Sequence, residues 1–143
     1  MLFTPYESLK KYIDQPSGSY DKEDVQKVAE MFEEDFRSLG FDVELIPGEK
    51  FGPKLLARIG RGPAQLMLMG HMDTVFPRAM MTPYTEQDDG TILGSGIMDM
   101  KGGVVVMLYA LKEVLPQLVH HQLPPGCKDF SDYYLSAERS QII

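Results

Sequence analysis

The sequence predicts one α/β domain in which helices and strands alternate in groups along the chain. Its 143 residues are 43% apolar and 24% charged, a composition typical of globular domains that bury a sizeable core. Near both ends of residues 3–117, apolar residues recur at helical spacing, and shorter strand-like segments lie between these two regions. Two helices, several strands and a further helix in this order indicate a layered α/β arrangement.

Two helices are expected at the N-terminus. Residues 3–14 have apolar side chains at helical spacing, and Pro16 follows them as a breaker. Asp21 is a suitable N-cap for the second helix, with Asp24 three residues later, close to a capping box. Gly40 lies where a helix of this length would end, because glycine readily adopts the left-handed C′ conformation. The apolar stripe of this helix is Val25, Val28, Ala29, Phe32, Phe36 and Leu39.

Three strands are expected next, at residues 41–46, 54–60 and 65–70. The third, QLMLMG, is continuously apolar, as is typical of a strand covered on both of its faces. Residues 77–90 read as irregular chain that ends in a turn, and TILGSG at 91–96 as a short strand followed by a glycine loop.

The last regular element predicted with a clear pattern is a helix over residues 102–115, which Pro116 would end. Beyond residue 117 the chain has no clean period, although residues 132–137 could form a strand. No internal repeat or low-complexity tract interrupts this organisation.

Composition excludes several classes of protein. The net charge of −7 argues against nucleic acid as a partner, because such proteins present a basic face, whereas it is compatible with cation binding. Cys127 is the only cysteine, so neither an internal disulfide nor a cysteine-based zinc site is expected. No apolar run approaches the roughly 18 residues that cross a bilayer, and no secretory signal is recognised. We expect a cytoplasmic protein without a membrane partner.

The apolar segment MLMGHMDTVF at residues 67–76 ends in two polar side chains, His71 and Asp73. Side chains two apart on a strand point to the same side, so an imidazole and a carboxylate would share one side of a cleft. An imidazole suits zinc, and a nearby carboxylate can orient the ring and raise its basicity. A surface or capping pair is the competing interpretation, and the spacing alone leaves both open.

A second chemistry-bearing segment is GSGIMDMKGG at residues 94–103, which places Asp99 in a glycine loop before the last helix. A helix cap is one interpretation. A phosphate loop is disfavoured, because no Gly-Lys precedes a Ser or Thr and Asp99 replaces the third glycine of a dinucleotide fingerprint. Two carboxylates and a histidine from two loops suit a cation better.

Together, GHMDTV and GSGIMDMKGG resemble the co-catalytic zinc peptidases and deacylases, the family of glutamate carboxypeptidase, acetylornithine deacetylase and succinyl-diaminopimelate desuccinylase. The glutamate carboxypeptidase branch is the most similar, with further likeness in SGSYDKEDV at 17–25 and LGFDVEL at 39–45. The resemblance covers about residues 5–117. It implies an incomplete zinc-exopeptidase catalytic domain with a central mixed β-sheet flanked by helices.

The resemblance also implies roles for individual residues. His71 would bind one zinc ion, Asp99 would bridge two, and Asp73 would act in catalysis by orienting His71. The peptide bond between Asp99 and Met100 would be cis. The implied reaction is hydrolysis of an amide bond in a small peptide or N-acyl amino acid by water activated between two zinc ions, which cobalt or manganese could replace.

The sequence departs from the family pattern after the last helix. There the family has an adjacent acidic pair, a further acid and a late histidine, whereas the acids after residue 118 are Asp129, Asp132 and Glu138. No segment matches the family's lid or dimerisation domain. We therefore divide the chain into residues 1–117, the N-terminal part of a catalytic domain, and 118–143, a divergent tail that we expect to be out-of-frame sequence or poorly ordered. The tail is either out-of-frame sequence or part of a short relative that has lost catalysis.

This division has consequences for function. His71 and Asp99 supply two of the about four ligands that zinc takes, so we expect weak zinc binding and little or no activity from this truncated chain. Sheet surface left uncovered would favour self-association. The alternatives are a non-catalytic fragment or binding module with a residual metal site, and, less favoured, an unrelated nucleotide-binding α/β domain.

Overall fold

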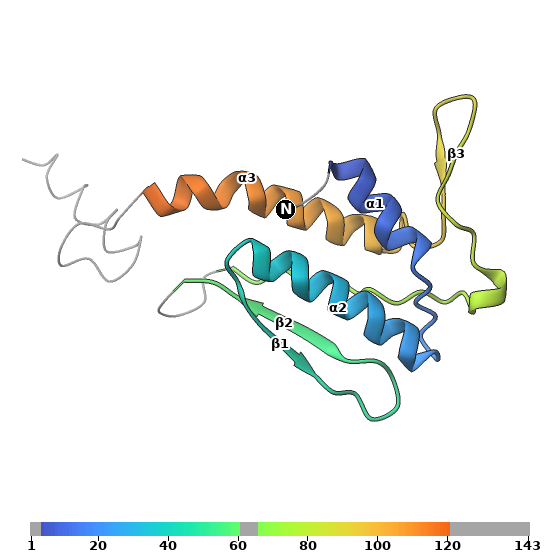
Figure 1. Cartoon of the computed structure of the whole chain (residues 1–143), viewed down its shortest axis with the longest axis horizontal. Coiled ribbons are helices and arrows are strands. Elements are labelled where there is room, and N and C mark those ends of the chain that lie inside the picture. Colours follow the sequence, from blue (N-terminus) through green and yellow to red (C-terminus); the bar gives the residue numbers. More distant parts are fainter. Residues whose placement is uncertain (1–3, 61–65, 121–143) are drawn as a thin grey trace, which may run out of the picture.

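The computed structural model describes residues 4–60 and 66–120. Within these ranges the chain forms three α-helices, one 3-10 turn and four short strands. The elements are α1 (Pro5–Asp14), α2 (Lys22–Ser38), β1 (Asp42–Ile46), β2 (Lys54–Arg58), η1 (Arg78–Met80), β3 (Thr85–Glu86), β4 (Ile92–Leu93) and α3 (Lys101–His120). Figure 1 shows α1 beside the first half of α3, and α2 between α3 and the β1–β2 hairpin. The predicted α/β class is confirmed.

The first two helices begin and end where local sequence signals place them. Thr4 and Glu7 form a capping box on α1, in which the Glu7 backbone N–H donates to Thr4 Oγ1 at 3.3 Å and the Thr4 N–H donates to the Glu7 carboxylate at 2.8 Å. Asp21 caps α2 by accepting from the Asp24 N–H at 3.2 Å. Gly40, with φ of 89°, follows the end of α2 in the left-handed region.

A small core joins the three helices. Its buried members are Tyr12 from α1, Val28 and Phe32 from α2, and Val104, Val105 and Leu108 from α3. The rings of Tyr12 and Phe32 stack with their centroids 3.9 Å apart, and the Tyr12 hydroxyl donates a hydrogen bond to the Asp35 carboxylate. Because α3 packs into this core from its first turn, the loop that precedes it is held in a fixed place.

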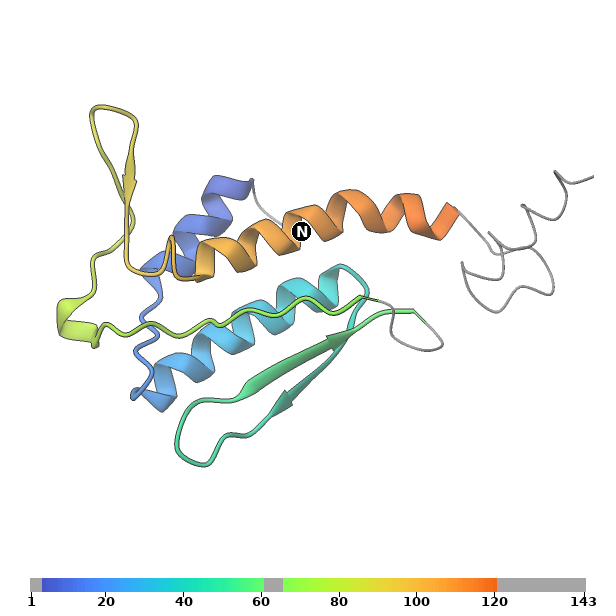
Figure 2. The same cartoon turned by 180° about the vertical axis from the view of Figure 1, so that it is seen from behind.

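The predicted third strand is not formed by residues 66–70. They run as an extended segment that Figure 2 shows as a thin coil passing along α2, with no arrow drawn on it. The two described sheets are both two-stranded and antiparallel, β1 with β2 and β3 with β4, so no central mixed sheet appears in the described ranges. Leu66, Met67 and Met69 are largely exposed, contrary to the prediction of burial on both faces. A strand requires a neighbour that exchanges backbone hydrogen bonds with it, and no described strand pairs with these residues.

The helix α3 also differs from the prediction, because Pro116 lies inside it instead of ending it. A proline lacks the N–H of the helical ladder and its ring crowds the carbonyl four residues before it, but Pro116 lies within the last two turns of α3, where few hydrogen bonds follow it. The side-chain amide of Gln117, the next residue, donates to the Glu113 carbonyl oxygen at 3.2 Å. The strand considered at residues 132–137 lies outside the described residues. No helix in the described ranges has the length and apolar character required to cross a bilayer.

Candidate metal centre

The structure brings the three predicted site residues together. His71 Nε2 lies 2.8 Å from Asp99 Oδ1, although the two residues are 28 positions apart in the sequence. On the other side of the ring, His71 Nδ1 lies 3.0 Å from the carbonyl oxygen of Asp73 and 3.3 Å from its Oδ1 atom. The Asp99–Met100 peptide bond is cis, as the family resemblance implies. The two motifs therefore form one constellation.

The contacts of His71 determine where its ring carries protons. The Asp73 carbonyl oxygen can only accept, so Nδ1 donates to it. Nε2 faces a second acceptor, the Asp99 carboxylate, and this contact requires a proton or a cation between the two atoms. Burial by itself lowers the pKa of His71, but the hydrogen bond to Asp99 and the contacts with Asp73 together raise it. The pair is suited to hold a positive charge.

A loop far from Asp73 in the sequence holds this residue in place. The loop before α2 forms a parallel bridge with the segment after His71, in which the Ser19 N–H donates to the Thr74 carbonyl at 2.9 Å and the Thr74 N–H donates to the Ser17 carbonyl at 2.8 Å. The Ser19 hydroxyl donates to Asp73 Oδ2 at 2.5 Å. Residues 17–25 resemble the family in sequence, but no local pattern in them predicted this contact.

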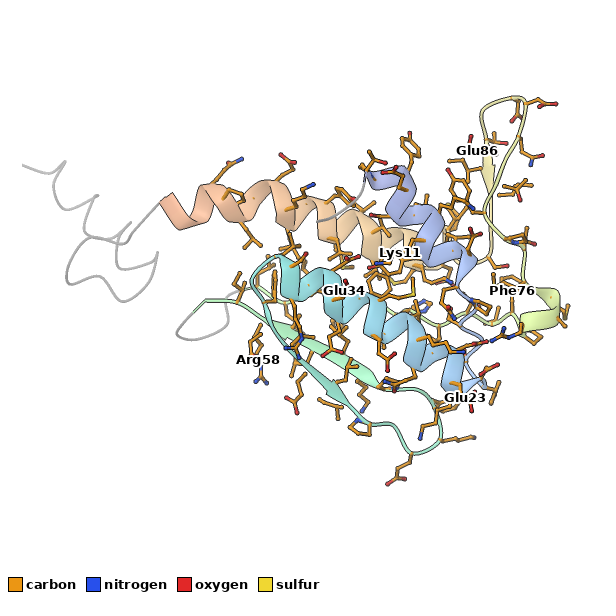
Figure 3. All side chains as sticks on the ribbon, in the orientation of Figure 1. Lys11, Glu23, Glu34, Arg58, Phe76 and Glu86 are labelled. Atoms are coloured by element: carbon orange, nitrogen blue, oxygen red, sulfur yellow. The ribbon has the colours of Figure 1, made fainter. Side chains whose placement is uncertain are left out.

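A cavity of about 520 Å³ opens beside the constellation. Its polar lining includes His71, Asp73, Asp99, Ser19, Thr82 and Ser95, and its apolar lining includes Val75, Phe76, Leu93 and Met98. Figure 3 labels Phe76 at the end of the molecule where the extended segment meets η1. The far wall is held by two hydrogen bonds, from the Thr82 N–H to Ser95 Oγ at 2.9 Å and from the Ser95 N–H to the Thr82 carbonyl at 2.8 Å. The volume is that of a site for a small ligand.

The donor set fits part of a zinc site. An imidazole nitrogen and a carboxylate oxygen are both zinc ligands, and zinc takes about four. The side chain of Asp99 is 84% exposed, so oxygen atoms remain accessible on the side away from His71. In the described part of the chain no group of three or more His, Cys, Asp or Glu side chains is placed to hold a metal ion. The residues present thus account for two donors.

Lys101, which follows this loop, has a different environment. Its side chain is fully buried, and Nζ donates to the Gln15 carbonyl oxygen at 2.8 Å. Burial lowers the pKa of Lys101 to about 8. A Cβ atom at Gly96, where φ is +89°, would lie 2.9 Å from Lys101 Cε, so this glycine permits both the turn and the buried lysine. The lysine therefore supports the loop that carries Asp99.

Residues 67–124 match a family of known proteins, peptidase family M20/M25/M40. This match begins at the segment that carries His71 and continues through Asp99 into α3. The match therefore includes both motifs, and it confirms the resemblance that they indicated.

Curated members of the family are similar over a longer part of the chain. Carboxypeptidase G2 of Pseudomonas sp. (strain RS-16) is 34% identical over 110 residues, which make up 73% of this chain and 26% of that protein. Acetylornithine deacetylase of Shigella sonnei (strain Ss046) is 41% identical over 85 residues, or 55% of this chain and 22% of that protein. The chain therefore spans about a quarter of the length of these M20/M25/M40 relatives.

A solved structure shares the fold. A tripeptidase from Staphylococcus aureus subsp. aureus Mu50 superposes with a TM-score of 0.59 at 23% sequence identity. The alignment covers 80% of this chain and 32% of the tripeptidase. The described helices and strands are thus arranged as in part of this tripeptidase structure.

Proposed function

We propose that this chain carries part of the active site of a metal-dependent amide hydrolase that acts on a small peptide or an N-acyl amino acid. The observation that carries the proposal is the 2.8 Å contact between His71 Nε2 and Asp99 Oδ1 beside an open cavity. The family match supports it, because the similar proteins are named a carboxypeptidase and an acetylornithine deacetylase. An amide bond is the bond common to a peptide and an N-acyl amino acid.

In this proposal His71 would hold a zinc ion through Nε2, and the carboxylate of Asp99 would be the ligand shared by two zinc ions. Cobalt or manganese could replace zinc, since both accept imidazole and carboxylate ligands. When bound, the metal pair supplies a Lewis acid and an acidified water for attack on the scissile carbonyl. Asp73 holds the Nδ1 side of the His71 ring, so that Nε2 stays directed at Asp99.

The cavity wall suggests how a substrate is held. Phe76, Leu93 and Met98 offer apolar surface to a substrate side chain, and Thr82 and Ser95 line the same cavity with hydroxyl groups. An apolar lining with a few polar groups is typical of small-ligand sites. The substrate would thus lie in the cavity with its amide bond close to His71 and Asp99.

We further propose that residues 1–117 are the N-terminal part of a catalytic domain and that the 143 residues alone bind zinc weakly and have little or no turnover. Two donors are fewer than the about four that zinc takes. The second candidate function is a binding module with a residual metal site. It is favoured by the same observation, that no third donor converges on His71 and Asp99 in the described ranges.

Zinc titration by calorimetry, together with hydrolysis of an N-acyl glutamate, tests the proposal. The variants are His71→Ala and Asp99→Asn, and the matched control is Glu86→Gln, which neutralises an exposed carboxylate on β3 outside the cavity. We expect zinc affinity to fall tenfold or more in the first two variants and to stay unchanged in the control.

Zinc-dependent turnover that disappears with His71→Ala supports the hydrolase and contradicts the binding module. Weak zinc binding without turnover agrees with a binding module and equally with an isolated part of a catalytic domain. Zinc affinity that is the same in Asp99→Asn as in Glu86→Gln contradicts the metal centre itself.

A further inference from the structure

We propose that Ser19 is a positioning residue of the candidate metal centre, where it holds the carboxylate of Asp73 and, through it, the ring of His71. The proposal rests on the proposed function, because it concerns the same site. Ser19 lies outside residues 67–124, the part of the chain that matches the family. Its role follows from the contacts around Asp73.

The two oxygen atoms of the Asp73 carboxylate have different partners. Oδ2 accepts the Ser19 hydroxyl at 2.5 Å, and Oδ1 lies 3.3 Å from His71 Nδ1. The Ser19 hydroxyl also lies 3.1 Å from the Thr74 carbonyl oxygen, but it has one proton and the shorter contact is to a charged acceptor. The hydroxyl thus fixes the rotation of the carboxylate about its last side-chain bond, and this rotation sets where Oδ1 meets the imidazole.

The backbone that carries Ser19 is itself held in place. The hydrogen bonds between residues 17–19 and Thr74 tie the loop to the segment that carries His71. Gly18 packs so closely that an added Cβ atom would lie 2.8 Å from the Phe76 carbonyl oxygen. The serine therefore presents its hydroxyl from a fixed position.

The neighbouring hydroxyl of Ser17 provides a contrast within the same loop. It is buried and has no hydrogen-bond partner in the described part of the chain. Only the hydroxyl of Ser19 reaches Asp73. A comparison of the two serines can therefore separate the effect of this hydrogen bond from the effect of removing any hydroxyl from the loop.

Loss of the Ser19 hydroxyl should change the protonation pattern of the His71 ring. The side chain of Asp73 is partly exposed, so without Ser19 it can turn toward water. Nδ1 would then keep only the Asp73 carbonyl contact, and the neutral ring would carry its proton on Nε2 more often. A ring protonated on Nε2 cannot bind a metal ion through that atom. Because direct partners of metal-binding histidines change affinity by about 10–100-fold, we expect about 3–10-fold for this indirect one.

The test uses the full metal-free chain and long-range ¹H–¹⁵N NMR of the His71 ring, at a pH at which the imidazole is neutral, followed by calorimetric titration with zinc. Ser19→Ala should raise the fraction of the Nε2-protonated tautomer and weaken zinc binding about 3–10-fold. Ser19→Thr, which keeps the hydroxyl, should restore both properties. Ser17→Ala, the matched control, should leave both as in the unmodified chain.

Two results would overturn the proposal. One is a tautomer ratio in Ser19→Ala equal to that of the unmodified chain, and the other is the same shift in Ser17→Ala. If Ser19→Ala does not fold, Ser19→Val and Ser19→Thr take its place, because they have similar shapes and differ in the hydroxyl. Identical tautomer ratios in this pair would also overturn the role of the hydroxyl. An unmodified chain that fails to bind zinc contradicts the proposed function, whereas the tautomer comparison still decides the role of Ser19.

Discussion

Replacing Arg78 by alanine should destabilise the protein more than replacing its partner Asp24. The Asp24 side chain, on α2, is 1% exposed, and it accepts a hydrogen bond from Arg78 Nε at 3.0 Å and a second from the Arg78 NH2 group. The Arg78 side chain is 60% exposed. Arg78→Ala leaves a buried carboxylate whose remaining ion-pair partner is Lys27 at 3.7 Å, whereas Asp24→Ala leaves a guanidinium group that water can solvate.

The magnitudes follow from this asymmetry. Removing one partner of a buried ion pair costs about 3–5 kcal/mol, and Lys27 still attenuates the charge, so we expect about 3 kcal/mol for Arg78→Ala. Asp24→Ala loses the same hydrogen bonds but buries no unpaired charge, for which we expect about 1–2 kcal/mol. The double variant should resemble Asp24→Ala, because the buried charge is absent from both.

Urea unfolding followed by circular dichroism measures these differences. With a denaturant slope of about 1–3 kcal/mol/M, a loss of about 3 kcal/mol moves the midpoint by about 1–3 M. Lys10→Ala is the matched control, since Lys10 pairs with Asp14 on the exposed face of α1 and such pairs contribute about 1 kcal/mol or less. The reasoning fails if Asp24→Ala destabilises the chain as much as Arg78→Ala.

Three further predictions concern the packing of the three-helix core and of the loop before α2. Tyr12→Phe should cost about 1–2 kcal/mol, because it removes the buried hydrogen bond to Asp35. Burial and the Asp35 contact raise the pKa of Tyr12 above its ordinary 10, so the stabilisation is present below about pH 10 and is lost at higher pH. In urea unfolding at alkaline pH, the phenylalanine variant should therefore lose less stability than the unmodified chain. An identical pH profile for the two proteins would contradict this. Leu108→Ala should cost about 3 kcal/mol in calorimetric unfolding, and a cost under about 1 kcal/mol would show that the three-helix core is not close-packed. Gly18→Ala should cost about 1–3 kcal/mol because of the 2.8 Å approach to the Phe76 carbonyl, and an unchanged melting temperature would show that the loop yields freely.

Features that depend on a few neighbouring residues were predictable from the sequence. Asp21 and Gly40 mark the ends of α2 because an N-cap bond and a left-handed turn involve residues no more than a few positions apart. The strand at residues 65–70 was predicted from the same kind of pattern, yet residues 66–70 form no strand. An apolar run shows that a segment can be covered, but it does not show whether neighbouring strands are present to cover it.

The candidate site also combines features that the sequence indicates with contacts that depend on the tertiary structure. Residue type and spacing marked His71, Asp73 and Asp99 as candidates for a cation site, and the resemblance of the two motifs to a known family supplied their expected roles. Only the tertiary structure decided that His71 meets Asp99 across 28 residues and that Ser19 meets Asp73 across 54. Hydrogen bonds of this kind depend on ångström-scale placement of separate segments, and this placement is set by how the helices pack, which no local spacing in the sequence encodes.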